Sequence, residues 1–493
     1  MDYEKYLELN KDEMIFALQD VIRSNSEEGE KIMGKNGEVY PFGMGVHEAL
    51  VKVLAMGEKM GFETKNVDNY GGHIDFVGTG KPVIDEKGNV TGYEKPKVMA
   101  IIGHLDVVPA GGGWDFDPYG GEVADGKIYG RGTTDNKGPV ISCLYAMKAM
   151  KDAGYKPQCT IRLILGLDEE TQWKGMEYYF DHVERPDFGF TPDADFPVIN
   201  GEKGMLVFSF AKKFSAATAK GLELRSLKGG TAPNSVADSC RAVLRSAQDG
   251  AYDKVKEIVQ AFKEETGHKV NVKGVGKSLE ITVTGISAHG ATPWKGLNAI
   301  SVMMQLLGRM NFVSEDHNEF IQFYNEYIGF NLHGENLGVD ISDEPSGRLV
   351  FNVGMAELDP EAGKLVINIR YPVTADGDAV LEKITETLDK FEIGLIHGKH
   401  KLPIYRDLDN PMVQVMLDVY RKHTGDTESK PLVIGGGTYA RSTPNIIAYG
   451  ALFPGDEDRM HQKNEYLSIE RFEQMTKIYA EAIYKLSSGE YNI

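Results

Sequence analysis

The sequence has few cysteines, an excess of acidic over basic residues, and no long apolar run. Its three cysteines, Cys143, Cys159 and Cys240, have neither paired spacing nor the spacing of metal ligands. We therefore expect reduced, buried thiols and a cytoplasmic protein. No stretch of about eighteen apolar residues occurs, and the first residues lack the basic and then apolar segments of a signal peptide. These absences disfavour membrane spanning and secretion.

Charge and composition narrow the range of partners. The chain of 493 residues has 54 Lys and Arg against 73 Asp and Glu, a net charge of -19. This balance argues against a nucleic-acid backbone or an anionic membrane as a partner, although solubility alone is a sufficient reason for it. With 41% hydrophobic and 26% charged residues, the composition is that of a globular protein, and the length is ample for large cores.

Apolar periodicity predicts helices and short buried strands towards both ends of the chain, a pattern typical of an α/β fold. The predicted helices cover residues 3–24, 41–61, 139–153, 411–424 and 468–487. The predicted strands cover residues 73–77, 98–103, 159–165, 188–190 and 446–450. Residues 90–95 and 114–125 are expected to form a turn and an irregular loop, because glycine, proline and polar residues dominate there.

The middle of the chain has an α+β pattern instead. Strands are predicted at residues 205–212, 270–272, 279–285 and 365–371, and helices at residues 252–266, 298–310 and 378–391. The sequence therefore predicts two domains. Residues 1–204 and 402–493 would form one domain, a mixed, mainly parallel sheet flanked by helices, and residues 205–401 would form an inserted α+β domain.

The apolar run at residues 98–103 is followed by His104 and Asp106. An unbroken apolar run suits a strand that is buried on both faces of a parallel sheet. Side chains two apart on an extended chain point the same way. Asp106 can therefore accept from one imidazole nitrogen of His104 while the other nitrogen binds a metal ion. Taken alone, this short motif favours a strand end whose histidine caps a neighbouring loop.

Acidic residues occur at corresponding places elsewhere. Asp135 lies near the start of the helix predicted at 139–153, where it could cap the helix or bridge two metal ions. Glu169 and Glu170 follow the strand at 159–165, and Asp193 follows the strand at 188–190. Adjacent acids after a strand are usually solvated loop charge. Beside a metal ion, however, one can bind the ion and the other can act as general base.

Five residues form a set that suits two metal ions: His104, Asp135, Glu170, Asp193 and His461. Most are predicted at carboxyl ends of strands, where open α/β sheets bind ligands. One bridging carboxylate, with one histidine and one carboxylate terminal on each ion, favours zinc or manganese over calcium or magnesium. Two ions about 3.5 to 4 Å apart would share an activated water, so with a free general base the set is suited to hydrolysis.

The chain resembles one enzyme family over nearly its whole length. The blocks at residues 103–109, 130–138, 168–170, 192–193 and 460–461 are similar, in order and spacing, to co-catalytic metallopeptidases. These include carboxypeptidase G, aminoacylase and succinyl-diaminopimelate desuccinylase. Residues 191–197, the block ending at Asn234 and the length of the middle region most resemble the dipeptidase V group, whose members cleave Xaa-His or β-Ala-Xaa dipeptides.

The resemblance implies a role for each matching residue of the metal set. Asp135 would bridge the two ions. Glu170 and His461 would complete one metal site, and His104 and Asp193 would complete the other. Asp106 would orient His104, and Glu169 would be the general base.

The resemblance also implies that the inserted domain is a lid with substrate-binding residues. His289 would donate to the oxyanion of the tetrahedral intermediate, and Arg370 and Asn234 would hold the substrate carboxylate. Without the resemblance, His289 would be interpreted as a turn residue and Arg370 as an exposed strand end. Gly435 and Gly436 could offer N–H groups to the substrate or merely turn the chain.

These implications predict an enzyme that hydrolyses dipeptides with a free C-terminus, with two divalent ions as cofactors, Zn²⁺ first and Mn²⁺ or Co²⁺ as alternatives. One rival function is hydrolysis of N-acyl amino acids of the desuccinylase or deacetylase type. Another is a catalytically silent metal- or peptide-binding protein. The presence of Glu169, the expected general base, together with all five ligand-type residues argues against it. A lid of about 200 residues is roughly twice the length of one small α+β unit, so a second unit could take the place of a partner subunit. We therefore expect a monomer. The alternative is an ordinary dimer in which the extra length is surface decoration.

Overall fold

The computed structural model describes residues 2–216 and 220–491. The chain divides into two compact units. The first comprises Met1–Asn200, Arg406–Leu432 and Gly437–Ile493, and the second comprises Gly201–Tyr405 and Val433–Gly436. The boundaries drawn from the sequence, after residues 204 and 401, each differ by four residues from these.

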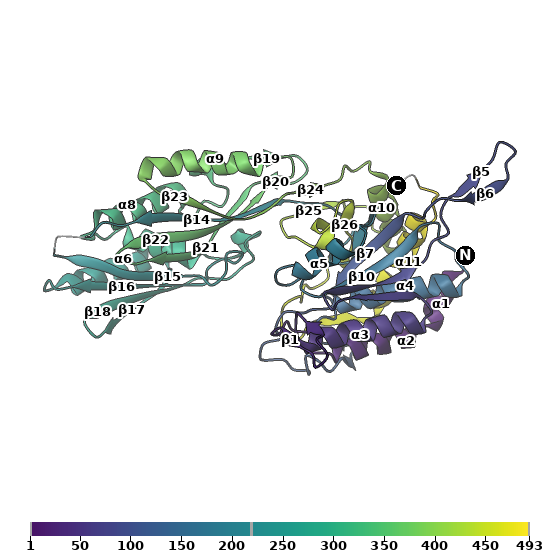
Figure 1. Ribbon diagram of the computed structural model, residues 1–493. Coiled ribbons are helices and arrows are strands. Elements are labelled where there is room, and N and C mark those ends of the chain that lie inside the picture. Colours follow the sequence, from purple (N-terminus) through teal and green to yellow (C-terminus); the bar gives the residue numbers. More distant parts are fainter. Residues whose placement is uncertain (1, 217–219, 492–493) are drawn as a thin grey trace. The chain divides into compact units, whose positions relative to one another are not determined.

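The first unit is built on a mixed sheet (Figure 1) whose strands run in the order β26-β11-β7-β10-β4-β3. The bounds are β3 (Glu63–Val67), β4 (Gly71–Phe76), β7 (Val98–His104), β10 (Thr160–Gly166), β11 (Phe188–Thr191) and β26 (Ile446–Ala448). β7 pairs in parallel with β10 and β11, and β11 pairs in parallel with β26. β4 and β3 are antiparallel additions at one edge, so the parallel strands lie at the centre.

Helices cover this sheet and bury its central strands. Met99, Ala100, Ile101 and Ile102 of β7 have no exposed surface, as the unbroken apolar run predicts. α4 packs with α11 and contacts β7 and β10. The helices of the unit are α1 (Tyr3–Leu9), α2 (Lys11–Ile22), α3 (Met44–Lys59), α4 (Lys137–Asp152), α5 (Lys174–His182), α10 (Pro411–Thr424) and α11 (Ile469–Ser487).

Short strand pairs complete the first unit. The pairs are β1 (Ile32–Met33) with β2 (Val39–Tyr40), β5 (Pro82–Ile84) with β6 (Val90–Tyr93), and β12 (Ala194–Asp195) with β27 (Ala451–Leu452). A three-stranded sheet has the order β28 (Tyr466–Ser468), β9 (Lys127–Tyr129) and β8 (Glu122–Ala124). Three further strands lie where the chain passes from one unit to the other: β13 (Ile199–Glu202), β24 (Ile404–Tyr405) and β25 (Leu432–Ile434). The pairing of β28 with β9 joins two segments that are far apart in the sequence.

The second unit has one antiparallel sheet with the order β17-β18-β16-β15-β21-β22-β14-β23. The bounds are β14 (Gly204–Lys213), β15 (Leu222–Gly229), β16 (Ser239–Ser246), β17 (Lys269–Val275), β18 (Ser278–Thr284), β21 (Val350–Leu358), β22 (Ala362–Tyr371) and β23 (Gly394–Lys401). The helices are α6 (Ala251–Thr266), α7 (Ala299–Leu307), α8 (Glu315–Phe323) and α9 (Gly377–Leu388), and the pair β19 (Ser342–Asp343) with β20 (Gly347–Arg348) is separate. The predicted fold class is confirmed.

Several local predictions were wrong. The helix predicted over residues 3–24 is two helices, because Asn10 (φ −97°, ψ 3°) leaves the helical conformation. The turn at residues 90–95 includes β6, which pairs with β5, and the loop at residues 114–125 includes β8, which pairs with β9. β6 belongs to a two-stranded hairpin, and β8 is the edge strand of a three-stranded sheet with β9 and β28. β6 has four residues and β8 has three, so the alternation of each is too short to stand out from a polar loop.

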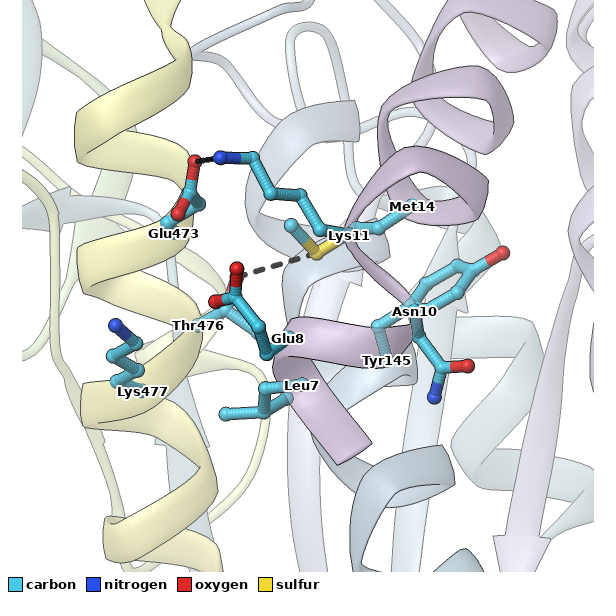
Figure 2. Close-up of a pocket in the computed structure, with 9 residues that line it drawn as sticks. All are labelled: Leu7, Glu8, Asn10, Lys11, Met14, Tyr145, Glu473, Thr476 and Lys477. Carbon is cyan, nitrogen blue, oxygen red and sulfur yellow. Dashed lines mark hydrogen bonds and ion pairs between the residues drawn. The ribbon is translucent and has the colours of Figure 1, made fainter. Parts of the chain in front are cut away.

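A small hollow among α1, α2, α4 and α11 marks a joint between helices (Figure 2). Lys11 Nζ lies 2.6 Å from Glu473 Oε1 across it, and the hydroxyl of Thr476 donates to the sulfur of Met14. Its volume of about 10 Å³ holds about one water molecule, so it is not a substrate site. Among the described residues, none of the helices is both long enough and apolar enough to cross a membrane.

Candidate metal centre

Three parallel strands of the first unit end beside one another with polar side chains. His104 is the last residue of β7, and it is level with Gly166, the last residue of β10. Glu169 and Glu170 follow β10, and Asp193 follows β11. Because parallel strands present their carboxyl ends at one edge of the sheet, these side chains meet there.

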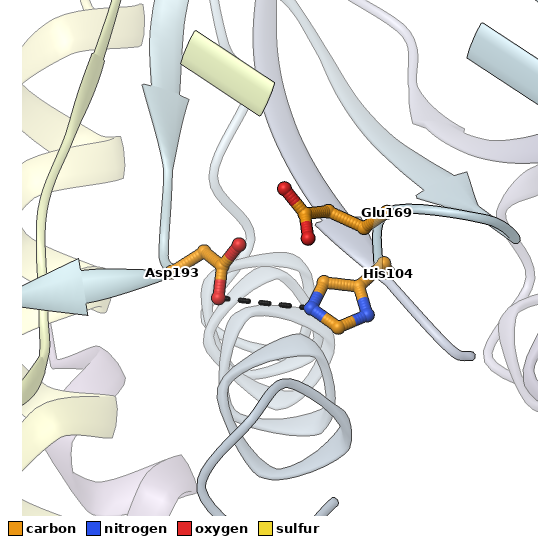
Figure 3. A group of neighbouring side chains, drawn as sticks. All are labelled: His104, Glu169 and Asp193. Atoms are coloured by element: carbon orange, nitrogen blue, oxygen red, sulfur yellow. Dashed lines mark ion pairs between the residues drawn. The ribbon is translucent and has the colours of Figure 1, made fainter. Parts of the chain in front are cut away.

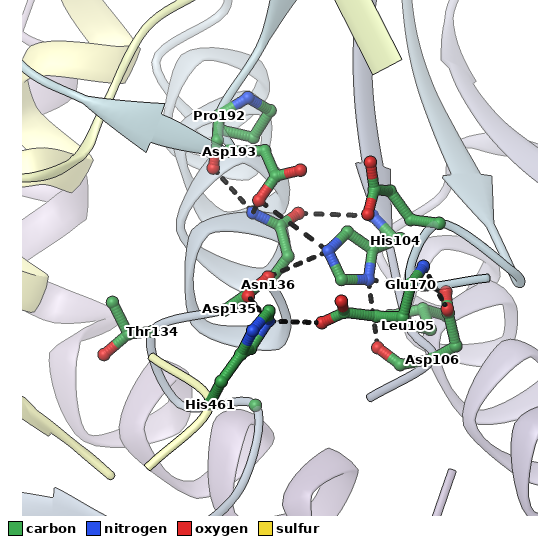
Figure 4. Close-up of polar contacts among 12 residues, drawn as sticks. His104, Leu105, Asp106, Thr134, Asp135, Asn136, Glu170, Pro192, Asp193 and His461 are labelled. Atoms are coloured by element: carbon green, nitrogen blue, oxygen red, sulfur yellow. Dashed lines mark hydrogen bonds and ion pairs between the residues drawn. The ribbon is translucent and has the colours of Figure 1, made fainter. Parts of the chain in front are cut away.

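Asp135 lies between two histidines, just before α4 (Figure 4). Its Oδ1 is 2.9 Å from Nε2 of His104, and its Oδ2 is 2.9 Å from Nε2 of His461. Nε2 of His461 also lies 3.0 Å from Oε1 of Glu170. One carboxylate thus faces two imidazole nitrogens through its two oxygens, an arrangement suited to bridging two ions.

His104 is fully buried and held in one orientation. Its Nδ1 lies 2.9 Å from the main-chain oxygen of Asp106. A carbonyl oxygen only accepts, so Nδ1–H donates and Nε2 is the nitrogen that faces Asp135. The carboxylate of Asp106 is 3.4 Å from Nδ1 through Oδ1, and its Oδ2 accepts from the N–H of Glu170 at 3.0 Å. Asp106 therefore contacts His104 most closely through its main chain.

Glu169 and Asp193 also lie close to His104 (Figure 3). Nε2 of His104 is 3.7 Å from Oδ1 of Asp193. Ligand atoms of His104, Glu169 and Asp193 all lie within 4.8 Å of one another, and the same holds for His104, Asp135 and Glu170. Both groups contain His104, so the side chains form one continuous cluster.

The carboxylates of the cluster are crowded and partly withdrawn from water. Burial and the nearby Asp193 raise the pKa of Glu169 well above its ordinary value, and burial and Asp135 raise the pKa of Glu170 to about 7. Burial opposes the charged form of His461, but hydrogen bonds to Asp135 and Glu170 prevail and raise its pKa to about 11. Metal binding at this cluster would therefore release protons, because each ligand binds a cation in its deprotonated form.

The donor set fits two divalent cations. It combines imidazole nitrogen with carboxylate oxygen, which zinc and neighbouring transition metals accept, whereas calcium and magnesium prefer oxygen alone. A dication would also offset the mutual repulsion of the carboxylates. The residues that could hold the ions are His104, Asp135, Glu170, Asp193 and His461, and the structure brings all five together.

Asn136 belongs to this site, although the sequence analysis did not single it out. It is fully buried, and its Oδ1 accepts from the main-chain N–H of His104 at 3.2 Å. Its Nδ2 donates to the main-chain oxygen of Pro192 at 2.6 Å and to Oδ1 of Asp193 at 3.3 Å. It therefore joins the loops that carry three of the five candidate ligands. The sequence feature that could have identified it is its position directly after Asp135.

The predicted substrate residues lie in the second unit. Arg370 on β22 is buried, contrary to the exposed strand end that it would be without the resemblance, and its Nε donates to Asn368 Oδ1 at 3.2 Å. A methyl group added at Gly435 would lie 3.7 Å from Cγ of Arg370 and 2.8 Å from Cβ of Ala291, so a side chain there would crowd its neighbours. Arg370 and Gly435 are therefore neighbours.

His289 and Asn234 form a second neighbouring pair in the same unit. His289 forms an isolated antiparallel bridge with Ser235, and the N–H of Gly290 donates to the oxygen of Asn234 at 2.7 Å. Nδ1 of His289 accepts from the N–H of Ala291 at 3.3 Å. Ala291 thus links this pair to Gly435. A methyl group added at Gly436 would lie 3.7 Å from Cδ1 of Ile434.

A mixed α/β sheet with imidazoles and carboxylates at its carboxyl edge defines the class of metal-dependent hydrolases. Residues 100–485 match Peptidase family M20/M25/M40, and the chain belongs to this family. The resemblance seen in the sequence is confirmed. Membership makes the chain a peptide-bond hydrolase that uses divalent metal ions.

Relatives match over the full length. YtjP of Bacillus subtilis is 35% identical over 493 residues, covering 99% of this chain and 100% of that protein. The Beta-Ala-Xaa dipeptidase of Lactobacillus delbrueckii subsp. lactis is 34% identical over 496 residues, covering 99% of each. The crystal structure of aminoacylhistidine dipeptidase from Vibrio alginolyticus has a TM-score of 0.55 at 15% identity over 96% of both chains, a likeness of fold.

Proposed function

We propose that this protein is a metal-dependent dipeptidase that hydrolyses dipeptides with a free C-terminal carboxylate. The observation that carries the proposal is the position of Asp135, which offers one oxygen to His104 and the other to His461. A carboxylate that faces two ligand nitrogens through its two oxygens is well placed to bridge two cations. The full-length similarity to a Beta-Ala-Xaa dipeptidase supports a dipeptide as the substrate.

Two divalent ions at this site would supply Lewis acidity, polarising the peptide carbonyl and making water a better nucleophile near neutral pH. In the proposal Glu170 and His461 complete one site with Asp135, and His104 and Asp193 complete the other. Zinc is the ion that we propose, with manganese or cobalt as substitutes, because imidazole and carboxylate together suit these ions.

Glu169 is proposed as the general base. It takes the proton of the attacking water and returns it to the amine that leaves. Burial and Asp193 raise its pKa well above its ordinary value, which increases its affinity for the proton that it must accept. A general base works best when its pKa lies near the operating pH, and a raised pKa brings a glutamate closer to neutral pH.

The carboxyl end of the dipeptide is assigned to the second unit. Arg370 would pair with the substrate carboxylate together with Asn234, and Gly435 and Gly436 would offer main-chain N–H groups. His289 would donate to the oxyanion of the tetrahedral intermediate. The burial of Arg370 supports this part of the proposal, because a guanidinium withdrawn from water interacts strongly with a carboxylate.

The substrate class is tested with three classes of compound, namely free dipeptides, their C-terminal amides and N-acyl amino acids, on protein reconstituted with zinc, manganese or cobalt. We expect β-Ala and Ala dipeptides to be cleaved. Amidation of the C-terminus should cost most of the activity, because a neutral amide cannot form the charge-assisted hydrogen bonds that a carboxylate forms with Arg370. Faster cleavage of N-acetyl or N-succinyl amino acids would favour an amidohydrolase instead. Equal rates on acid and amide would remove Arg370 from its role.

We also propose that the protein acts as a monomer in the cytoplasm. The sheet of the second unit has two four-stranded halves, joined where Leu227–Gly229 of β15 pair with Ala356–Leu358 of β21. One half would thus occupy the place of a partner subunit. The outer strands, β17 and β23, are mostly exposed and carry several lysines, which discourages pairing between chains. Three buried free thiols suit a reducing compartment.

A further inference from the structure

A buried carboxylate holds the loop that carries Asp135. Glu465 has no exposed surface, and its Oε1 accepts from three main-chain N–H groups, those of Gly132 at 3.1 Å, Thr134 at 2.9 Å and Asp135 at 3.3 Å. The loop at residues 132–135 therefore closes around one oxygen atom. The third donor is the main chain of the proposed bridging ligand itself.

The other oxygen of Glu465 pairs with a buried arginine. Arg131 is 1% exposed, and its Nη1 lies 2.7 Å from Glu465 Oε2. Nη1 also donates to the main-chain oxygen of Gln462 at 3.2 Å, and Nη2 donates to that of Pro109 at 3.4 Å. Gln462 is the residue after His461, and Pro109 lies three residues after Asp106. The pair thus ties together three segments that each contain a residue of the metal centre.

The fold brings these distant segments together through a strand pair. β28 begins at Tyr466 and pairs with β9, so that Glu465 meets Gly130, whose N–H donates to its main-chain oxygen at 3.0 Å. The hydroxyl of Thr134 donates to the oxygen of Tyr466 at 3.0 Å. The pairing fixes Glu465 only four residues after His461. The loops of Asp135 and His461 are therefore positioned by one local structure.

From these contacts we propose that the Arg131–Glu465 pair is a positioning device that sets the affinity of the metal ion shared by Asp135, Glu170 and His461. The inference rests on the proposed metal centre. Ligands must be held to within about half an ångström for tight binding. Partners that orient metal ligands typically change affinity by about ten- to a hundredfold when they are lost. Glu465 is fully buried, so it acts through the loops of Asp135 and His461.

The test is the metal affinity of Glu465→Gln, measured by calorimetric titration of metal-free protein with zinc. The Gln oxygen can still accept from the loop, but its NH₂ group meets the guanidinium of Arg131, donor against donor. We expect at least one of the two dissociation constants to rise about ten- to a hundredfold. The visible spectrum of the cobalt-loaded protein should change as well, because it reports ligand geometry.

Asp75→Asn is the matched control. It disrupts another, largely buried Asp–Arg pair of the same unit, in which Asp75 meets Arg162 at 2.7 Å and 2.9 Å, away from the metal ligands. Both variants should lower the melting temperature, but the control should keep both metal affinities and the cobalt spectrum of the wild type. Wild-type affinities in Glu465→Gln would overturn the inference. A wild-type protein that binds no metal would instead refute the proposed function.

If Glu465→Gln fails to fold, Arg131→Lys decides the question. Lysine keeps the charge next to Glu465 but cannot reach the oxygens of Gln462 and Pro109 at the same time. At least one of the two metal affinities should fall several-fold while the fold, judged by circular dichroism, is retained. A folded Arg131→Lys protein with both wild-type affinities would contradict the proposal.

Discussion

At the scale of single residues, the candidate ligands are oriented by neighbours that are themselves fixed. The main-chain N–H of His104 donates to Asn136, its Nδ1 donates to Asp106, and its Nε2 faces Asp135. Asp135 in turn is held through its N–H by Glu465. Such buried polar networks stabilise one geometry, because each partner left without its contact costs free energy.

A buried histidine outside the metal centre predicts a pH dependence of stability. Burial and then the charge of Arg162 lower the pKa of His73 to about 4, against the effect of Asp75, and the hydroxyl of Tyr179 lies 2.7 Å from its Nδ1. The unfolded chain would bind this proton near pH 6.5. The folded state therefore loses stability as the pH falls from about 6.5 to about 4, by at most about 3 kcal/mol.

His73→Gln should remove this part of the pH dependence, because glutamine can still accept from Tyr179 but does not titrate. Urea unfolding at a series of pH values, with a chelator present for both proteins, measures the effect. The variant should lose less stability than the wild type between pH 6.5 and 4. Parallel curves for the two proteins would show that His73 is not the cause.

The ligand-type residues of the site could be predicted from the sequence, but not all the residues that hold them in position. His104, Glu169, Glu170 and Asp193 follow recognisable buried strands, so the carboxyl edge of a parallel sheet could be predicted for them. Glu465 has no such signal. It follows a polar turn, and only the three-dimensional pairing of β28 with β9 brings it to the loop before Asp135.

At the scale of elements, one amide holds the loop that carries Asn234. Asn352 on β21 is buried, and its Nδ2 donates to the main-chain oxygens of Pro233 at 3.2 Å and Ser235 at 3.0 Å. Asn352→Leu should leave both oxygens without this donor and release the loop. We expect the KM for a free dipeptide to rise about tenfold, a loss of about 1.4 kcal/mol, with unchanged metal content.

Asn325→Leu is the control for that experiment. It removes another donation from an asparagine to a main-chain oxygen in the same unit, here to Met304 at 2.8 Å. Its KM should stay near that of the wild type. If Asn352→Leu also keeps its KM, or if both variants change it equally, the loop has no specific role in binding the dipeptide.

Elements with strong end signals could be predicted well, and those with interrupted alternation could not. α10 begins and ends where the sequence placed it, because Pro411 follows the cap Asn410 and Gly425 ends the helix. β21 was missed, because a bulge between Val353 and Met355 breaks its alternation. β15 and β16 were also missed. A bulge between Leu224 and Ser226 interrupts the alternation of β15, and the small residues Cys240 and Ala242 make the buried face of β16 only weakly apolar.

At the scale of the whole molecule, the proposed monomer can be tested by mixing two inactive proteins. His289→Ala and Glu169→Ala each remove one proposed catalytic group. If each chain completes its own site, the mixture stays inactive at every ratio, and light scattering gives the mass of one chain. Recovered activity together with a dimer mass would contradict the monomer, because mixed dimers would then contain one intact site.

The central claim is that the cluster is a two-metal centre with Glu169 as its base. The most direct measurement is the metal content and the turnover of Asp135→Ala and Glu169→Ala beside the wild type. Glu169→Ala should keep two ions per chain and lose turnover by about 10²- to 10⁴-fold, because only the proton acceptor is gone. Asp135→Ala should lose bound metal as well. If Glu169→Ala loses its metal while Glu170→Ala remains active, the roles of these two acids are reversed.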